Sequence, residues 1–192
     1  ESTGTIGRRF EKLDIENTPE NRRAYREMLF TTPGLEDYIS GVILNEETVY
    51  QTTNDGTPLI QILTEKGIIP GVKVDKGTAN MPFHHGEKVT HGLDNLSERL
   101  EGYRERGARF TKWRAVYTIG EGMPSEANIM ANTQGLVLYG GFSQEEGLVP
   151  ITEPEVLADG SHSIYGSAQA TQRVLYTLFE ALDSYGINLK GM

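Results

Sequence analysis

The sequence alternates strand-like and helix-like segments along nearly its whole length. Four short apolar runs have the length of strands, at residues 39–44, 68–75, 109–118 and 148–156. A serial strand–helix order predicts a parallel sheet with right-handed crossovers. Two architectures then compete, a doubly wound sheet and a (βα)8 barrel. No glycine fingerprint for a dinucleotide follows a strand in this chain, which favours the barrel.

The predicted helices carry recognisable start, stop and face signals. Thr18 and Pro19 suit the cap and first position of a helix over residues 19–31, and Gly67 ends a helix over 58–66. Further helices are predicted over 93–106, 124–146 and 168–185. Their inward residues are expected to be Leu93, Leu96, Leu100 and Tyr103 in the first, and Val174, Leu175, Leu178 and Leu182 in the last.

A complete barrel of this kind takes about 250 residues, more than this chain has. We therefore predict one partial barrel domain over residues 1–192, from the end of strand 1 to the start of strand 6 at residues 187–189.

Composition narrows the function classes without choosing among enzymes. A net charge of −9 opposes non-specific binding to nucleic acid or to an anionic membrane surface. The absence of cysteine excludes a disulfide framework, a thiol nucleophile and a cysteine metal site. His84, His85 and His91 share a polar segment but lack further ligands at metal spacing, so we predict no metal site. With 37% hydrophobic and 23% charged residues, the chain resembles an ordinary folded domain.

Three predicted strands carry charged residues two positions apart, which places each pair on one face. The pairs are Lys73 with Asp75, Lys112 with Arg114, and Glu153 with Glu155. Parallel strands are normally buried on both faces, so these charges need partners or a purpose. A solvated rim or a stabilising ion-pair network is one explanation. Three pairs on successive strands favour the other, an active site at the carboxyl ends of the barrel strands.

The residue types in these pairs suggest a particular chemistry. Lysine and arginine neutralise phosphate oxygens, and a cluster of cations favours the free amine of a lysine. On the residues alone, Lys112 is a candidate imine-forming nucleophile, and the two glutamates are candidate proton-transfer groups. Trp113 should face the opposite way and pack between sheet and helices. The hydroxyl-rich start, residues 1–5, followed by Arg8 and Arg9, suggests an anion site or a polar turn before a surface helix.

Eight segments, in order along the chain, resemble the class I fructose-bisphosphate aldolases. They are ESTG at 1–4, ENT at 16–18 with NRR at 21–23, GVIL at 41–44, KVDKG at 73–77, GLDNLSER at 92–99, KWR at 112–114 and EPE at 153–155. The resemblance implies a (βα)8 barrel and reversible cleavage of fructose 1,6-bisphosphate to dihydroxyacetone phosphate and glyceraldehyde 3-phosphate. It implies an imine between a lysine and the ketose, no metal or other cofactor, and a homotetramer. The net charge and the absence of cysteine predict a cytoplasmic protein with no nucleic-acid or membrane partner.

The resemblance also assigns roles to individual residues. Glu153 matches the proton-transfer glutamate, Glu155 its partner in imine formation, and Lys112 the lysine that supports carbinolamine dehydration. The matched substrate-binding residues are Lys73, Arg114, Ser2, Thr5, Arg9 and Arg22, and Asp75 belongs to the surrounding network.

The imine lysine itself is expected beyond Met192, and Lys190 is expected to be an ordinary strand residue. A different imine-forming aldolase remains an alternative, which the ESTG, KWR and EPE segments disfavour. Another alternative is an inactive barrel fragment that binds phosphorylated ligands or a protein partner.

Overall fold

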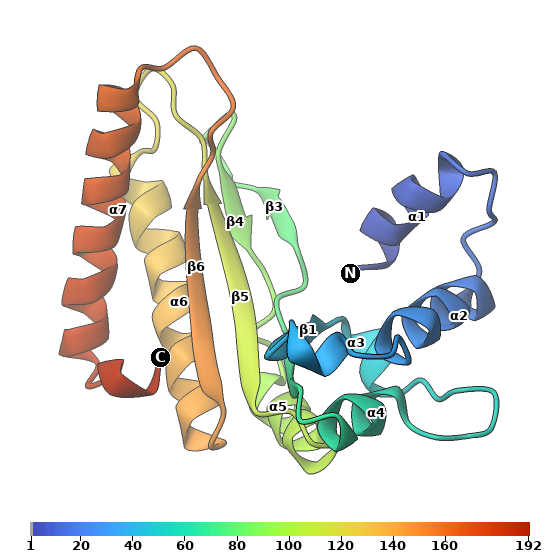
Figure 1. Ribbon diagram of the computed structural model, residues 1–192. Helices are drawn as coiled ribbons and strands as arrows, with labels where there is room; N and C mark the ends of the chain where they lie inside the picture. The colour runs from blue at the N-terminus through green and yellow to red at the C-terminus, as the bar shows by residue number, and fades with distance from the viewer. Residues whose placement is uncertain (1) are drawn as a thin grey trace. The chain divides into compact units, whose positions relative to one another are not determined.

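A computed structural model describes residues 2–192 of the chain (Figure 1). The chain divides into two compact units, which are described separately. The first comprises residues 1–74 and 101–111, and the second comprises residues 75–100 and 112–192. Helix α5 (Leu96–Glu105) and strand β5 (Phe110–Tyr117) each run across a boundary between the units. The predicted face of α5 is confirmed at Leu96, Leu100 and Tyr103, which are buried, whereas Leu93 precedes the helix.

The first unit contains two parallel strands and several helices. Strands β1 (Gly41–Leu44) and β2 (Ile69–Lys73) pair in parallel, with Gly41 opposite Ile69 and Leu44 opposite Val72. A short 3₁₀ helix, η1 (Leu35–Asp37), precedes β1, and helices α3 (Glu46–Val49) and α4 (Leu59–Glu65) connect β1 to β2. Gly67 closes α4 with φ +73°, as predicted from the sequence.

Helix α2 (Pro19–Phe30) confirms the predicted start signals. The Thr18 hydroxyl accepts a hydrogen bond from Asn21 N at 3.1 Å, and Pro19 stands at the first helical position. This bond satisfies one of the N–H groups that the first turn of a helix leaves without an intrahelical partner.

The predicted end of a first strand is wrong for the described residues 2–5. Ser2 is extended, but helix α1 (Thr3–Glu11) begins at the next residue, and the Ser2 carbonyl accepts from Thr5 N and Ile6 N, each at 3.0 Å. Ile6 and Phe10, four positions apart, form the buried face of α1, and Phe10 makes an edge contact with Tyr25 of α2 at 5.7 Å. Burial of this helical face explains why the segment is not extended. Glu1 lies outside the described residues.

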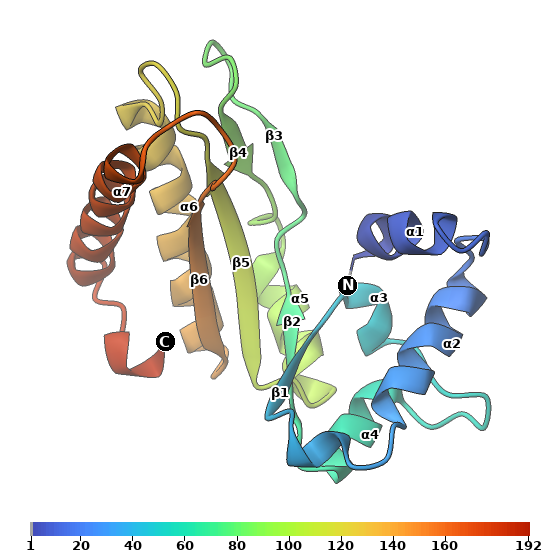
Figure 2. The same cartoon turned by 45° about the horizontal axis from the view of Figure 1, so that its top comes forward.

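The second unit packs two long helices against two strands. Helices α6 (Glu126–Glu145) and α7 (Ile164–Ser184) lie side by side and both contact strand β6 (Val149–Val156) (Figures 1 and 2). Ser125 and Ser163 cap the two helices through their hydroxyl groups. Trp113 of β5 is fully buried and stacks on Tyr139 of α6 at 5.5 Å, which confirms the prediction that Trp113 packs against a helix.

The predicted inward face of α7 needs one correction. Val174, Leu178 and Leu182 are buried at successive spacings of four, but Leu175 is 38% exposed. A neighbouring residue in a helix points about 100° away, so the face that buries Val174 turns Leu175 toward its edge.

A short hairpin in the second unit was not predicted. Strands β3 (Thr78–Asn80) and β4 (Lys88–Thr90) pair antiparallel, with Thr78 opposite Thr90. The segment with His84 and His85 forms the turn of this hairpin. Strands of three residues are too short for a periodic pattern, so the sequence signal was weak.

The predicted strand at residues 187–189 is also wrong, since a 3₁₀ helix, η2 (Leu189–Gly191), occupies this region. Side chains form hydrogen bonds with the backbone N–H and C=O groups that would otherwise pair with a neighbouring strand. Gln144 bonds both the N–H and the carbonyl of Asn188, at 3.0 and 2.8 Å, and Asn188 Oδ1 accepts from Lys190 N at 3.1 Å.

Candidate active site

Strands β5 and β6 bring four of the predicted residues together. Lys112 forms an ion pair with Glu153, and Arg114 forms an ion pair with Glu155. We call these four residues the strand-pair cluster. Each strand contributes alternate residues, so the two pairs stand as successive steps on one face while Trp113 points to the helices. The predicted same-face pairs therefore match across two strands.

Within the strand-pair cluster, Arg114 and Glu155 stabilise each other's charged forms. The hydrogen bond from Arg114 holds the pKa of Glu155 below its ordinary value, against a smaller raising effect of burial, and the charges of Arg114 and Lys112 add to the lowering. The bond to Glu155 likewise raises the pKa of Arg114, which stays charged. Glu155 is thus a carboxylate at neutral pH and an acceptor for nearby cations.

Two further residues form hydrogen bonds with the backbone of β5 at Arg114. Asp75, 8% exposed, accepts hydrogen bonds from Arg114 N at 3.2 Å and from Gly77 N at 3.1 Å. Thr90 donates from its hydroxyl to the Arg114 carbonyl at 2.9 Å. Sequence reasoning missed Thr90, because it lies in a three-residue strand and carries no charge.

In the first unit, Ser2 and Lys73 line one small cavity of about 80 Å³ with Ile43, Leu44 and Asn45. Lys73 is the last residue of β2. The Ser2 hydroxyl donates to Thr5 Oγ1 at 3.1 Å, and Arg8 Nη2 donates to the same oxygen at 3.3 Å. Three of the predicted phosphate-binding residues, Ser2, Thr5 and Lys73, thus lie at or next to this cavity. The convergence of Lys73 with the strand-pair cluster stays a prediction.

Arg9 and Arg22 lie elsewhere in the first unit. Arg9 lines a different cavity, of about 190 Å³, between α1, α2 and β1. Arg22 is buried and donates to Glu47 from Nη2 at 2.6 Å and from Nε at 2.9 Å, and its Nη1 donates to Asn17 O at 3.0 Å. Arg26 also donates to Glu47, at 2.6 Å. The hydrogen bond from Arg22 is the main cause that lowers the pKa of Glu47.

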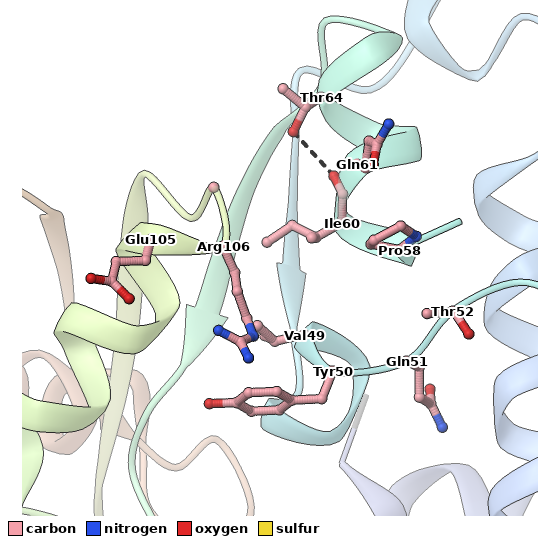
Figure 3. A pocket seen from close by; sticks show the side chains of 11 residues that line it. Val49, Tyr50, Gln51, Thr52, Pro58, Ile60, Gln61, Thr64, Glu105 and Arg106 are labelled. Atoms are coloured by element: carbon pink, nitrogen blue, oxygen red, sulfur yellow. Dashed lines mark hydrogen bonds between the residues drawn. The ribbon is translucent and has the colours of Figure 1, made fainter. Parts of the chain in front are cut away.

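A cavity beside α4 involves none of the predicted residues. It measures about 430 Å³ and lies between α4, the end of α3 and the end of α5 (Figure 3). Val49 and Ile60 form its buried apolar floor, and the Arg106 guanidinium stands 4.5 Å above the ring of Tyr50. One cation over a tyrosine supplies neither a proton-transfer pair nor a phosphate cradle, so the strand-pair cluster remains the better candidate.

Two other features are absent from residues 2–192. No group of three or more His, Cys, Asp or Glu side chains in this range is arranged to hold a metal ion. No helix in the same range is long and apolar enough to cross a membrane.

The comparisons with known proteins agree along the whole chain. The family model for fructose-bisphosphate aldolase class-I matches residues 1–192. Fructose-bisphosphate aldolase 4, cytosolic, of Arabidopsis thaliana is 52% identical over 191 residues, which cover 100% of this chain and 49% of the relative. The cytoplasmic isozyme of Spinacia oleracea is 51% identical over 100% of this chain and 54% of its own length.

A bacterial relative and a solved structure extend this agreement. A probable class 1 aldolase of Xanthomonas axonopodis pv. citri is 53% identical, again over 100% of this chain and 57% of its own length. The fructose-bisphosphate aldolase of Plasmodium falciparum, solved with TRAP and a small-molecule inhibitor, superposes with a TM-score of 0.96 at 49% identity, covering 100% of this chain and 56% of that chain. The chain thus spans about half the length of the relatives it matches.

These matches confirm the fold prediction, a partial (βα)8 barrel, and exclude the doubly wound sheet. The eight segments that suggested the family lie within a match that spans residues 1–192. The chain belongs to the class I fructose-bisphosphate aldolase family.

Proposed function

We propose that this chain carries part of the active site of a fructose-bisphosphate aldolase. The reaction is the reversible cleavage of fructose 1,6-bisphosphate to dihydroxyacetone phosphate and glyceraldehyde 3-phosphate, through an imine between a lysine and the ketose carbonyl. The observation that carries the proposal is the strand-pair cluster, two lysine or arginine residues facing two glutamates on β5 and β6. Family membership agrees with it.

Each member of the strand-pair cluster has a role in this proposal. Glu153 takes and returns the protons that imine formation and carbon–carbon cleavage require. Lys112 assists loss of water from the carbinolamine and contacts the substrate. Glu155, held as a carboxylate by Arg114, stabilises the cations around it. The protonated imine accepts the electron pair of the C3–C4 bond as that bond breaks.

Phosphate recognition falls to residues of the first unit in this proposal. Ser2 and Lys73 share a cavity, Thr5 bonds to Ser2, and an ammonium with hydroxyl groups suits phosphate oxygens. Arg22 is assigned to substrate binding on the resemblance alone, and Arg9 on the resemblance together with the hydroxyl-rich segment before it. The bonds of Arg22 to Glu47 favour a structural role for that residue.

The proposal includes a homotetrameric, cytoplasmic protein. Support comes from the family and from relatives that are named cytosolic or cytoplasmic. Light scattering on the complete protein tests the oligomeric state. A monomeric mass would overturn this part alone.

Reductive trapping tests the chemistry. The complete barrel is incubated with dihydroxyacetone phosphate and sodium borohydride, and its peptides are mapped by mass spectrometry. We expect a covalent adduct on one lysine outside residues 1–192. An adduct on Lys112 would instead make that residue the nucleophile. No adduct in an otherwise folded protein would refute the imine mechanism.

A further inference from the structure

Side chains hold both polar backbone groups of Arg114. Its N–H donates to Asp75 Oδ2 at 3.2 Å, and its carbonyl accepts from Thr90 Oγ1 at 2.9 Å. The N–H and C=O of one strand residue point to the same edge of the strand. Asp75 and Thr90 therefore both form hydrogen bonds with the same residue of β5, on the same edge of the strand. We call these two residues the Arg114 clamp.

Each member of the Arg114 clamp is itself fixed. Asp75 Oδ1 accepts from Gly77 N at 3.1 Å, which orients the carboxylate. Thr90 N donates to Asn132 Oδ1 at 3.2 Å, and Asn132 Nδ2 donates to Lys88 O at 2.9 Å. Asn132 lies on α6 and is 2% exposed. Asn132 thus holds the β3–β4 hairpin against α6 by hydrogen bonds, and Thr90 connects the hairpin to β5 through its bond to the Arg114 carbonyl.

The backbone after Thr90 passes very close to the strand. Gly92 has φ +131°, and a Cβ there would lie 2.9 Å from Lys76 N and 3.2 Å from both Asp75 Cα and Trp113 Cζ3. Only glycine fits such an approach without a shift. This tight passage brings the hydroxyl of Thr90 within reach of the Arg114 carbonyl.

We propose that Thr90 and Asp75 are positioning residues that hold Arg114, and through it Lys112, in register with Glu155 and Glu153. The proposal rests on the aldolase function proposed above. Lys112 lies two residues before Arg114 on the same face, so a displaced Arg114 backbone displaces both pairs. Misplacement of a reacting group by 1 Å costs on the order of 100-fold in rate.

The test compares Thr90→Val with Thr90→Ser in the complete protein. Valine keeps the shape and removes the donor, so kcat should fall about tenfold while KM changes less than about twofold. Serine keeps the donor and should restore kcat to within about twofold of wild type. Thr177→Val is the matched control, because Thr177 Oγ1 also donates to a carbonyl, Arg173 O at 3.0 Å, on α7. It should leave kcat unchanged.

A second readout separates positioning from stability. Arg114 keeps the pKa of Glu155 low, with Lys112 acting in the same direction, while Glu153 and Asp75 also face Arg114. Loosening Arg114 lets the pKa of Glu155 rise toward its ordinary value. The acid limb of kcat/KM should then move to higher pH in Thr90→Val and stay in place in Thr90→Ser. Loss of stability alone would not move this limb.

The outcomes distinguish the two proposals. An active wild type whose kcat and pH profile are unchanged in Thr90→Val overturns the Arg114 clamp and leaves the aldolase function standing. A wild type without aldolase activity overturns the function instead. The clamp is then decided by hydrogen exchange at the Arg114 amide, which should speed up at least tenfold in Asp75→Ala, because alanine removes both acceptor oxygens. An unchanged exchange rate would overturn the clamp.

Discussion

Two groups of paired charges, one in each unit, differ in how far they are buried. In the first unit, the side chains of Arg22 and Arg26 are 8% and 4% exposed, and both bind Glu47. In the strand-pair cluster of the second unit, the side chains of Arg114 and Glu155 are 40% and 38% exposed. A buried charge that loses its partner is costly, whereas a half-exposed one is solvated by water. Arginine and glutamate therefore suit a structural role in the buried group around Glu47 and a chemical role in the half-exposed strand-pair cluster.

The largest expected effect falls on turnover. Glu153→Gln keeps the shape of the side chain but cannot exchange protons, so kcat should fall by about 10²–10⁴-fold. Steady-state kinetics and a binding assay with fructose 1,6-bisphosphate measure the two effects separately. Unchanged turnover would remove Glu153 from the mechanism.

The stability of Glu153→Gln should stay close to wild type, because the side chain of Glu153 is 37% exposed and its ion pair is worth at most about 1 kcal/mol. Thermal unfolding provides this control. A large loss of stability would mean that the strand-pair cluster is structural in the way that Glu47 is with Arg22 and Arg26.

The reverse pattern is expected at Glu47. Glu47→Gln removes the carboxylate that the buried guanidinium groups of Arg22 and Arg26 share, so the free energy of unfolding should fall by about 3 kcal/mol. Urea denaturation measures this loss. Glu36→Gln is a matched control, since Glu36 pairs with Lys66 near the surface and its loss should cost no more than about 1 kcal/mol. Equal losses of unfolding free energy in Glu47→Gln and Glu36→Gln would contradict the claim that burial makes the Glu47 pairs more important for stability.

A smaller effect is expected on how the stability of the protein falls at acidic pH. The bond from Arg22 lowers the pKa of Glu47 from its ordinary value of 4.5, and the unfolded chain regains that ordinary value. The carboxylate therefore contributes stability above about pH 4.5, and this contribution is lost as the pH falls through the lowered pKa. Stability measured from pH 6 downward should decline less steeply in Glu47→Gln than in wild type. Parallel curves would contradict the assignment.

Local signals predicted much of this architecture. The Thr18–Pro19 start of α2 and the glycine that closes α4 follow from backbone chemistry within a few residues. Two-residue spacing placed Lys112 with Arg114 and Glu153 with Glu155, because side-chain direction in a strand has a period of two. The four residues of the strand-pair cluster could therefore be identified from the sequence alone.

Contacts between distant segments could not be predicted in this way. Arg22 meets Glu47 across 25 positions, and only the fold makes them neighbours. Thr90 reaches Arg114 from a three-residue strand that has no periodic signal. Gln144 diverts residues 188–191 from a strand through side-chain bonds that no local propensity encodes. Each miss involves a side chain that satisfies the backbone or charge of a remote residue.

The central claim is that the strand-pair cluster surrounds the reacting sugar. A crystal structure of the complete protein after borohydride reduction with dihydroxyacetone phosphate tests it most directly. We expect the trapped triose to contact Lys112 and Glu153, with their ion pair rearranged around it. A triose attached elsewhere, with both ion pairs of the cluster intact and out of contact, would contradict the account.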